Sequence, residues 1–146
     1  MALAMVCKAD QKLPKKVKES FESRYKGATD VLWSFVDENL SINFQHDESA
    51  RTAIYTPEGV WLQTTTSIED SKIPECIIEK ITGEYMDVVF DQASVVETPE
   101  SMEYEIMITS SEEELLDSGK TRDVIQTLIL RYGKNCSFLG EKPMEN

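Results

Sequence analysis

The sequence predicts an α+β fold in which one supersecondary unit, a helix followed by four antiparallel strands, is used twice. The 146 residues repeat a pattern at a spacing of 60, so that Leu13-Pro14 recurs as Ile73-Pro74 and Val17, Phe21 and Tyr25 recur as Ile77, Ile81 and Tyr85. Between the two helical stripes, apolar residues alternate with polar ones, which is typical of half-buried strands. We expect two fused units, residues 13–70 and 71–132, whose helices cover one face of a sheet and leave the other to solvent.

The first unit begins with an amphipathic helix over residues 14–25. Pro14 suits its first turn, and Gly27 can form its left-handed end. Four strands are then predicted, over residues 31–36, 40–45, 51–56 and 60–68. The second has the clearest alternation, with Leu40, Ile42 and Phe44 on one face. Turns rich in Asp, Asn, Pro and Gly separate the strands.

The second unit repeats this order less clearly. A helix is predicted over residues 74–83, strands over 88–97 and 104–108, and a weak strand or loop over 112–116. Residues 120–130 fit both a strand and a helical period, and the match of Gly119 to Gly59 in the repeat favours a strand. Residues 1–12 are expected to be a flexible lead-in. Residues 133–146 are expected to be a polar tail with Phe138 and Leu139 as a docking point.

The charge of the chain limits its partners. The net charge is −12, and residues 97–117 contain eight acidic and no basic side chains. Such a field repels nucleic acids and anionic membranes, and it attracts a basic protein or a hard cation. Glu103 and Glu105 are therefore candidate contacts for a basic partner. No run of residues approaches the roughly 20 apolar residues that a membrane-spanning helix needs.

No catalytic, cofactor or metal motif stands out. The single histidine, His46, falls in a predicted turn, and no nucleophile elbow, phosphate loop or zinc spacing is present. Glu112-Glu113-Glu114 lacks the spacing of a calcium loop. We therefore predict a protein that is not an enzyme and has no cofactor. A disulfide, Cys76–Cys136 for example, is compatible with the three cysteines, but their spacing does not determine one.

Aromatic residues suggest a binding surface. Alternation places Trp61 with Gln63 and Thr65 on the exposed side of the last strand of the first unit. Tyr55 and Trp33 are candidates for the same surface. Tryptophan and tyrosine on a rigid open sheet are typical of protein-binding hot spots. The alternative is that these rings pack under loops or against each other across strands.

One stretch resembles a known family. Leu13-Pro14, Val17, Phe21, Tyr25, Gly27-Ala28, Val31 and Trp33 resemble the motif of the PepSY-like, β-lactamase-inhibitor-like repeat family, small exported proteins of Bacteroidetes-type bacteria. Lys26 stands where the family prefers proline, and the second unit matches mainly by its offset. The resemblance implies a continuous antiparallel sheet with a concave open face, similar to the β-lactamase inhibitor protein. It also implies a periplasmic or secreted location, and it implies no reaction.

Three functional hypotheses follow from these observations. The leading one is a non-catalytic exported module that binds an unidentified protein or peptide on the open face of its sheet. The second is a cation-binding envelope protein that uses the acidic segment 97–117. The third is an enzyme inhibitor, although no loop of distinctive composition stands out. The identity of the partner and the oligomeric state stay open at this point, as does whether the apolar residues 1–7 are the remnant of a signal peptide.

Overall fold

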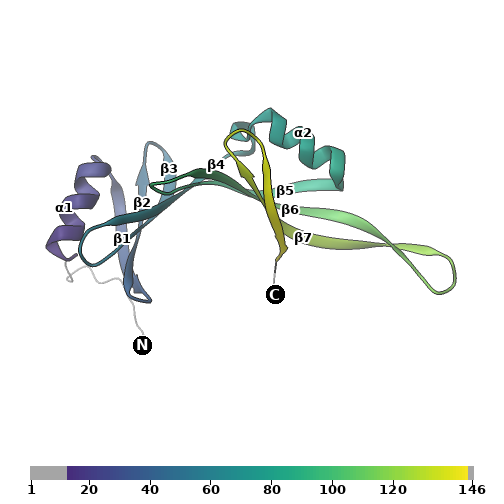
Figure 1. The fold of residues 1–146 in the computed structure, drawn as a ribbon, viewed down its shortest axis with the longest axis horizontal. Helices are drawn as coiled ribbons and strands as arrows, with labels where there is room; N and C mark the ends of the chain where they lie inside the picture. Colours follow the sequence, from purple (N-terminus) through teal and green to yellow (C-terminus); the bar gives the residue numbers. More distant parts are fainter. Residues whose placement is uncertain (1–12, 145–146) are drawn as a thin grey trace. The chain divides into compact units, whose positions relative to one another are not determined.

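The computed structural model describes residues 13–144, and the expected lead-in over residues 1–12 lies outside them (Figure 1). The elements are α1 (Lys15–Arg24), β1 (Thr29–Val36), β2 (Asn39–His46), β3 (Ser49–Tyr55), β4 (Trp61–Ile68), the 3₁₀ turn η2 (Asp70–Lys72), α2 (Glu75–Glu84), β5 (Met86–Glu97), β6 (Met102–Leu115), β7 (Thr121–Gly133) and β8 (Phe138–Pro143). The eight strands are hydrogen-bonded neighbours in chain order, with β1 and β8 at the two ends of one open antiparallel sheet. The predicted α+β class is confirmed.

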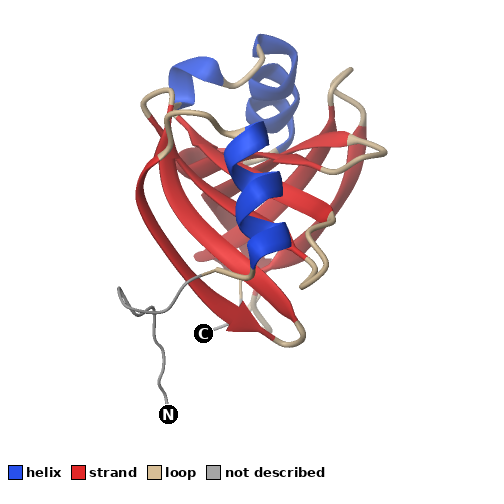
Figure 2. Cartoon of the chain, turned by 90° about the vertical axis from the view of Figure 1, so that its left-hand side faces the viewer, coloured by secondary structure: helices blue, strands red, loops and turns tan. Residues whose placement is uncertain are grey.

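The chain forms two compact units. Unit one contains the described residues up to Ser67 together with Val96–Ser101. In it, α1 lies against the strands, as Figure 2 shows. The predicted helical stripe packs on one face of β2 and β3, and the core consists of Val17, Phe21, Tyr25, Leu40, Ile42, Phe44, Ala53 and Tyr55. Burial of this stripe stabilises the helix, because ten residues alone are too few for a stable helix in water.

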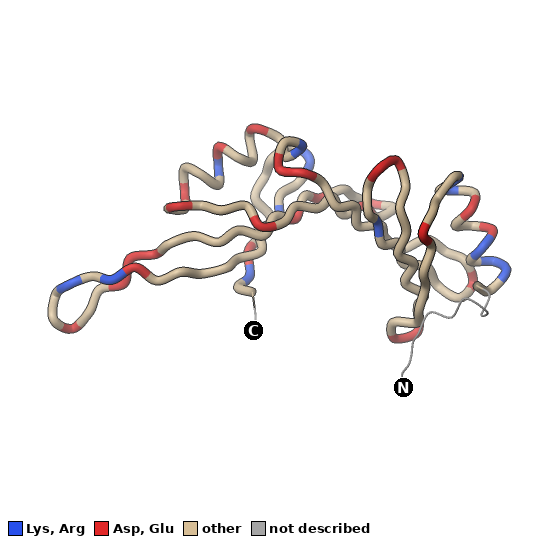
Figure 3. Tube along the Cα trace, turned by 180° about the vertical axis from the view of Figure 1, so that it is seen from behind, with Lys and Arg blue, Asp and Glu red and all other residues tan. Residues whose placement is uncertain are grey.

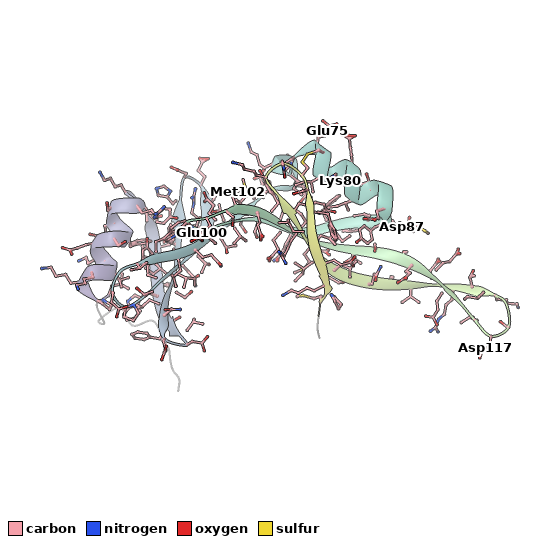
Figure 4. The ribbon with its side chains drawn as sticks, in the orientation of Figure 1. Glu75, Lys80, Asp87, Glu100, Met102 and Asp117 are labelled. Atoms are coloured by element: carbon pink, nitrogen blue, oxygen red, sulfur yellow. A yellow bond between two sulfur atoms is a disulfide. The ribbon has the colours of Figure 1, made fainter. Side chains whose placement is uncertain are left out.

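Unit two contains Ile68–Val95 and the described residues from Met102 onward. Its helix α2 buries Ile77 and Ile81 against a core that includes Ile106, Ile108, Leu128, Leu130 and Tyr132. Cys76 at the start of α2 forms a disulfide with Cys136 in the turn between β7 and β8, with Cα atoms 6.1 Å apart. The Lys80 side chain, labelled in Figure 4, donates a hydrogen bond to the Cys136 carbonyl. Two bonds of different kinds thus fix α2 to this turn.

The second half of unit two differs from the prediction. Residues 102–115 form one strand, β6, where two short segments were expected. Residues 121–133 form β7, which confirms the strand over 120–130. Residues 138–143 form β8, so the expectation of a polar tail after residue 132 is wrong for these residues. The β6–β7 hairpin extends past the end of α2 in Figure 1, and Asp117 marks its tip in Figure 4.

The equivalence of Gly59 and Gly119 is also wrong. Gly59 lies between β3 and β4, the last two strands of unit one, whereas Gly119 lies between β6 and β7. Both glycines donate their N–H to the carbonyl three residues earlier, over 2.9 Å, and Cys136 does the same in the turn before β8. One turn geometry therefore recurs three times, and a matching turn in the sequence did not identify the matching strands.

The position equivalent to Gly59 in unit two is Cys136. Each adopts positive φ, +90° for Gly59 and +68° for Cys136, and each lies four residues after a buried tyrosine, Tyr55 or Tyr132. A Cβ atom built on Gly59 would lie 2.6 Å from the Lys16 carbonyl oxygen in α1. Lys16 corresponds to Cys76 in the repeat. The two units therefore join helix and turn at the same place, one by close backbone contact and the other by a disulfide.

Candidate functional site

Strand pairing sorts the residues of unit one onto two faces. Leu40 pairs with Tyr55 and Ile42 with Ala53, and all four belong to the core under α1. The alternate pairs, which include Asn43 with Thr52, therefore point to the opposite face. We call this the open face. Its members, followed from strand to strand through the pairing, are Leu32, Ser34, Val36, Asn39, Ser41, Asn43, Gln45, Ala50, Thr52, Ile54, Gln63, Thr65 and Ser67.

The open face of unit one carries no charged side chain among these residues. This is unusual in a chain of which 29% is charged. A depression of about 350 Å³ lies on this face, lined by open-face residues that include Leu32, Asn43 and Thr52. Two charged residues also line it. Asp30 lies where the register of β1 shifts, and Arg51 pairs with Phe44 on the helix side, so neither belongs to the alternating set.

The open face combines hydroxyl and amide groups with exposed aliphatic side chains. The Thr52 hydroxyl donates a hydrogen bond of 2.7 Å to the Asn43 side-chain oxygen, which fixes both side chains on adjacent strands. Leu32 and Val36 remain 59% and 50% exposed. A partner can therefore cover apolar area and form hydrogen bonds here without removing an ionised group of this face from water.

The structure places Trp61 on the helix side, which corrects the predicted face. The pairing of β3 and β4 shifts between Ile54 and Tyr55, so that Gln63 lies opposite Ile54 while Trp61 lies opposite Tyr55. This β-bulge adds one residue, and it turns Trp61 away from Gln63. The Trp61 ring is half-buried, and its N–H donates a hydrogen bond of 2.7 Å to the Thr64 hydroxyl.

Neighbouring side chains hold Trp61 against α1. The Thr64 hydroxyl is itself 2.6 Å from the Tyr25 hydroxyl, and both groups are buried. The Arg24 guanidinium lies over the Trp61 ring, 3.8 Å from its centroid, as a cation–π contact. Trp61 therefore belongs to the packing of the helix on the sheet.

Tyr55 is fully buried, at 0% exposure, so the expectation that it is exposed is wrong. Burial, helped by the neighbouring Tyr25, raises the pKa of Tyr55 to about 12. Trp33 is half-buried, packs against the same core, and contacts the Phe35 ring edge to face. Of the predicted set in unit one, Gln63 alone lies on the open face.

Glu103 and Glu105 lie in unit two, on the face of β6 away from its core. Both are half-buried, Glu105 pairs with Arg131, and the Glu103 carboxylate accepts a hydrogen bond of 3.4 Å from the Arg131 guanidinium. A basic group of the same unit thus partly neutralises Glu103. Within residues 13–144, no three His, Cys, Asp or Glu side chains are grouped so that they could hold a metal ion.

Apart from Gln63 and Thr65, the residues that define the open face were not identified from the sequence. The signal was present in β2, where Ser41, Asn43 and Gln45 alternate with the core residues. To extend that polar face from β2 to the neighbouring strands, the pairing register of each hairpin must be known. In β4 the bulge shifts the alternation by one residue, and the sequence pattern gives no sign of it.

Over residues 13–144, an open antiparallel sheet of eight strands with two α-helices defines the fold class. No protein-family model and no curated protein matches the chain. Solved structures do match. A BLIP-like protein from Bacteroides fragilis matches with a TM-score of 0.73 and 16% identity over 94% of this chain and 91% of that one.

Two further solved structures agree with this match. A protein from Bacteroides eggerthii described as a putative periplasmic protein has a TM-score of 0.73 and 15% identity over 91% of this chain and 90% of its own. A DUF2874 family protein from Bacteroides ovatus has a TM-score of 0.70 and 17% identity over 91% of this chain and 89% of its own. The chain therefore has the BLIP-like fold, which confirms the fold implied by the resemblance. In the described residues, no helix is long and apolar enough to cross a membrane.

Proposed function

We propose that this protein is a non-catalytic, exported module that binds a protein or peptide through the open face of unit one. The observation that carries the proposal is the absence of charged side chains from the alternating set of residues that defines that face. Depletion of charged side chains is the compositional mark of the centre of a protein–protein interface. A solvated sheet face with no such role commonly carries charges, and elsewhere this chain has many.

The proposal assigns different tasks to the face and to the net charge. Contact on the open face would involve hydroxyl, amide and aliphatic groups such as Thr52, Asn43 and Leu32, so its dissociation rate should depend little on salt. The net charge of −12 would attract a basic partner from a distance and raise the association rate at low salt. A basic protein with an uncharged contact patch fits both features.

Two observations support export. The disulfide between Cys76 and Cys136 suits an oxidising compartment such as the periplasm or the outside of the cell. A solved structure with the same fold is described as a putative periplasmic protein. Recovery of the disulfide-bonded protein in a periplasmic extract of the native cells would test this location.

The binding surface is tested by placing charge on it. We expect Asn43→Arg with Thr52→Arg to abolish the capture of partners that the wild-type protein enriches from the native extracytoplasmic fraction. The matched control is Ser23→Arg with Ser118→Arg, which makes the same change in net charge at exposed sites off the open face. Melting curves verify that all variants fold. Equal capture by the open-face variant and the control would refute the proposed surface.

A further inference from the structure

The β6–β7 hairpin continues beyond the core of unit two that supports its base. Its two strands pair without a register shift along residues 103–115. Ser110 is the last buried residue of β6, and residues 112–115 and 121–123 are all exposed. Figure 4 shows this outer part of the hairpin, which projects past α2 to the tip at Asp117. Side chains on both faces of the outer part are therefore open to solvent.

The side chains of the outer part divide into two faces. Ile106 and Ile108 of β6 belong to the core of unit two, so the alternate residues of the hairpin point away from that core. We call the outer residues on this side the hairpin face: Ser111, Glu113, Leu115, Thr121, Asp123 and Ile125. Leu115 and Ile125 are each 73% exposed, the highest value for a large apolar residue in residues 13–144. The hairpin thus leaves aliphatic surface uncovered on one face.

The charges of the hairpin, coloured in Figure 3, are balanced on one face and unbalanced on the other. On the core side, the Arg122 guanidinium donates a hydrogen bond of 3.1 Å to the Glu114 carboxylate. The other basic residue, Lys120, lies in the turn between the strands. On the hairpin face, Glu113 pairs directly with Asp123. Within residues 13–144, neither of these two carboxylates has an ion pair or a hydrogen bond.

An opposed pair of like charges disfavours the pairing of the two strands. A local arrangement that costs stability without compensation in the fold is typical of a functional surface. A cation placed between Glu113 and Asp123 would remove this repulsion. Directly opposed residues have Cβ atoms roughly 5 Å apart, so one planar guanidinium with its five donors can reach both carboxylates.

We propose that the hairpin face binds a segment of another protein that presents an arginine between two apolar side chains. The arginine pairs with Glu113 and Asp123, and its apolar neighbours cover Leu115 and Ile125. Two copies of this chain cannot pair face to face here, because each would bring the same two carboxylates. The surface lies in unit two, so the proposal does not rest on the binding role of the open face of unit one.

Amide NMR of the ¹⁵N-labelled, disulfide-bonded full chain tests this proposal. The probe is an acetylated and amidated nonapeptide in which isoleucine, arginine and isoleucine occupy alternate positions between serines. At low ionic strength, we expect it to shift the amide signals of the hairpin face, with a dissociation constant of about 1 mM or lower. The same peptide with glutamate in place of arginine should shift none of them.

Variants separate the opposed carboxylates from the general negative charge. Glu113→Gln with Asp123→Asn should raise the dissociation constant at least about tenfold. This variant should unfold no more easily than the wild type, because the repulsion between the strands is removed. The matched control, Glu112→Gln with Asp117→Asn, makes the same change in net charge on the same hairpin, and it should change the constant less than about twofold.

Three outcomes would overturn the proposal. The first is equal weakening by both variants, which would mean that net charge alone attracts the peptide. The second is the absence of peptide-induced shifts on the hairpin face, whether or not signals of the open face such as Thr52 move. The third is a change of the hairpin signals with protein concentration in the absence of peptide, which would assign the face to self-association.

Discussion

Two glycines in the same turn geometry should respond differently to alanine. Gly59 and Gly119 have φ of +90° and +85°, so an alanine at either position bears the left-handed penalty of roughly 1–2 kcal/mol. At Gly119 the added methyl group would meet nothing within 4 Å. At Gly59 it would lie 2.6 Å from the Lys16 carbonyl oxygen. Forcing α1 away adds an overpacking cost of about 1–3 kcal/mol.

We therefore expect Gly119→Ala to cost about 1–2 kcal/mol and Gly59→Ala about 2–5 kcal/mol of unfolding free energy. Urea unfolding followed by far-ultraviolet circular dichroism measures both, provided that the slope m is unchanged. Fluorescence of Trp33 and Trp61 adds a probe confined to unit one. Equal losses, or a larger loss for Gly119→Ala, would refute the close contact of helix and turn in unit one.

Three further perturbations have defined outcomes. Replacing Cys76 and Cys136 by serine opens a loop of 60 residues and should lower the free energy of unfolding by about 2–4 kcal/mol. Urea unfolding of the variant and of the wild type without reductant measures this loss. Tyr25→Phe removes the hydroxyl that contacts Thr64 and should cost about 1–2 kcal/mol in the same assay, whereas no loss would argue against that bond. The raised pKa of Tyr55, about 12 against 10, keeps it neutral in the folded protein at pH values where the unfolded chain ionises. The contribution of Tyr55 to stability is therefore fully present below pH 10 and should fall by up to about 1.4 kcal/mol per pH unit between pH 10 and 12, and Tyr55→Phe should remove that part of the fall.

Patterns set by single elements were predictable from the sequence. The helical stripe of Val17, Phe21 and Tyr25 and the alternation in β2 each depend on one local period, and both match the structure. The helix and strand classes follow from such periods because burial of one face selects them. The α+β class and the order of the elements in unit one could be read in this way.

Features that depend on pairing between elements were not predictable. The bulge in β4 reversed the face of Trp61, and only its pairing with Tyr55 reveals that. The polar strand β8 looked like a tail, because a protected edge strand has little apolar alternation. The Gly119 turn matched Gly59 in sequence, since a left-handed glycine turn is set by local backbone geometry and not by its place in the sheet.

The binding role of the open face is tested most directly by crosslinking from it. A photoreactive amino acid in place of Thr52 lies on the open face, and the same residue in place of the exposed Glu19 lies on α1. After irradiation in the native extracytoplasmic fraction, mass spectrometry should find a defined protein attached at position 52 and not at position 19. Added Asn43→Arg should remove that adduct. Adducts at position 19 alone, or an adduct at position 52 that persists with Asn43→Arg, would contradict the account.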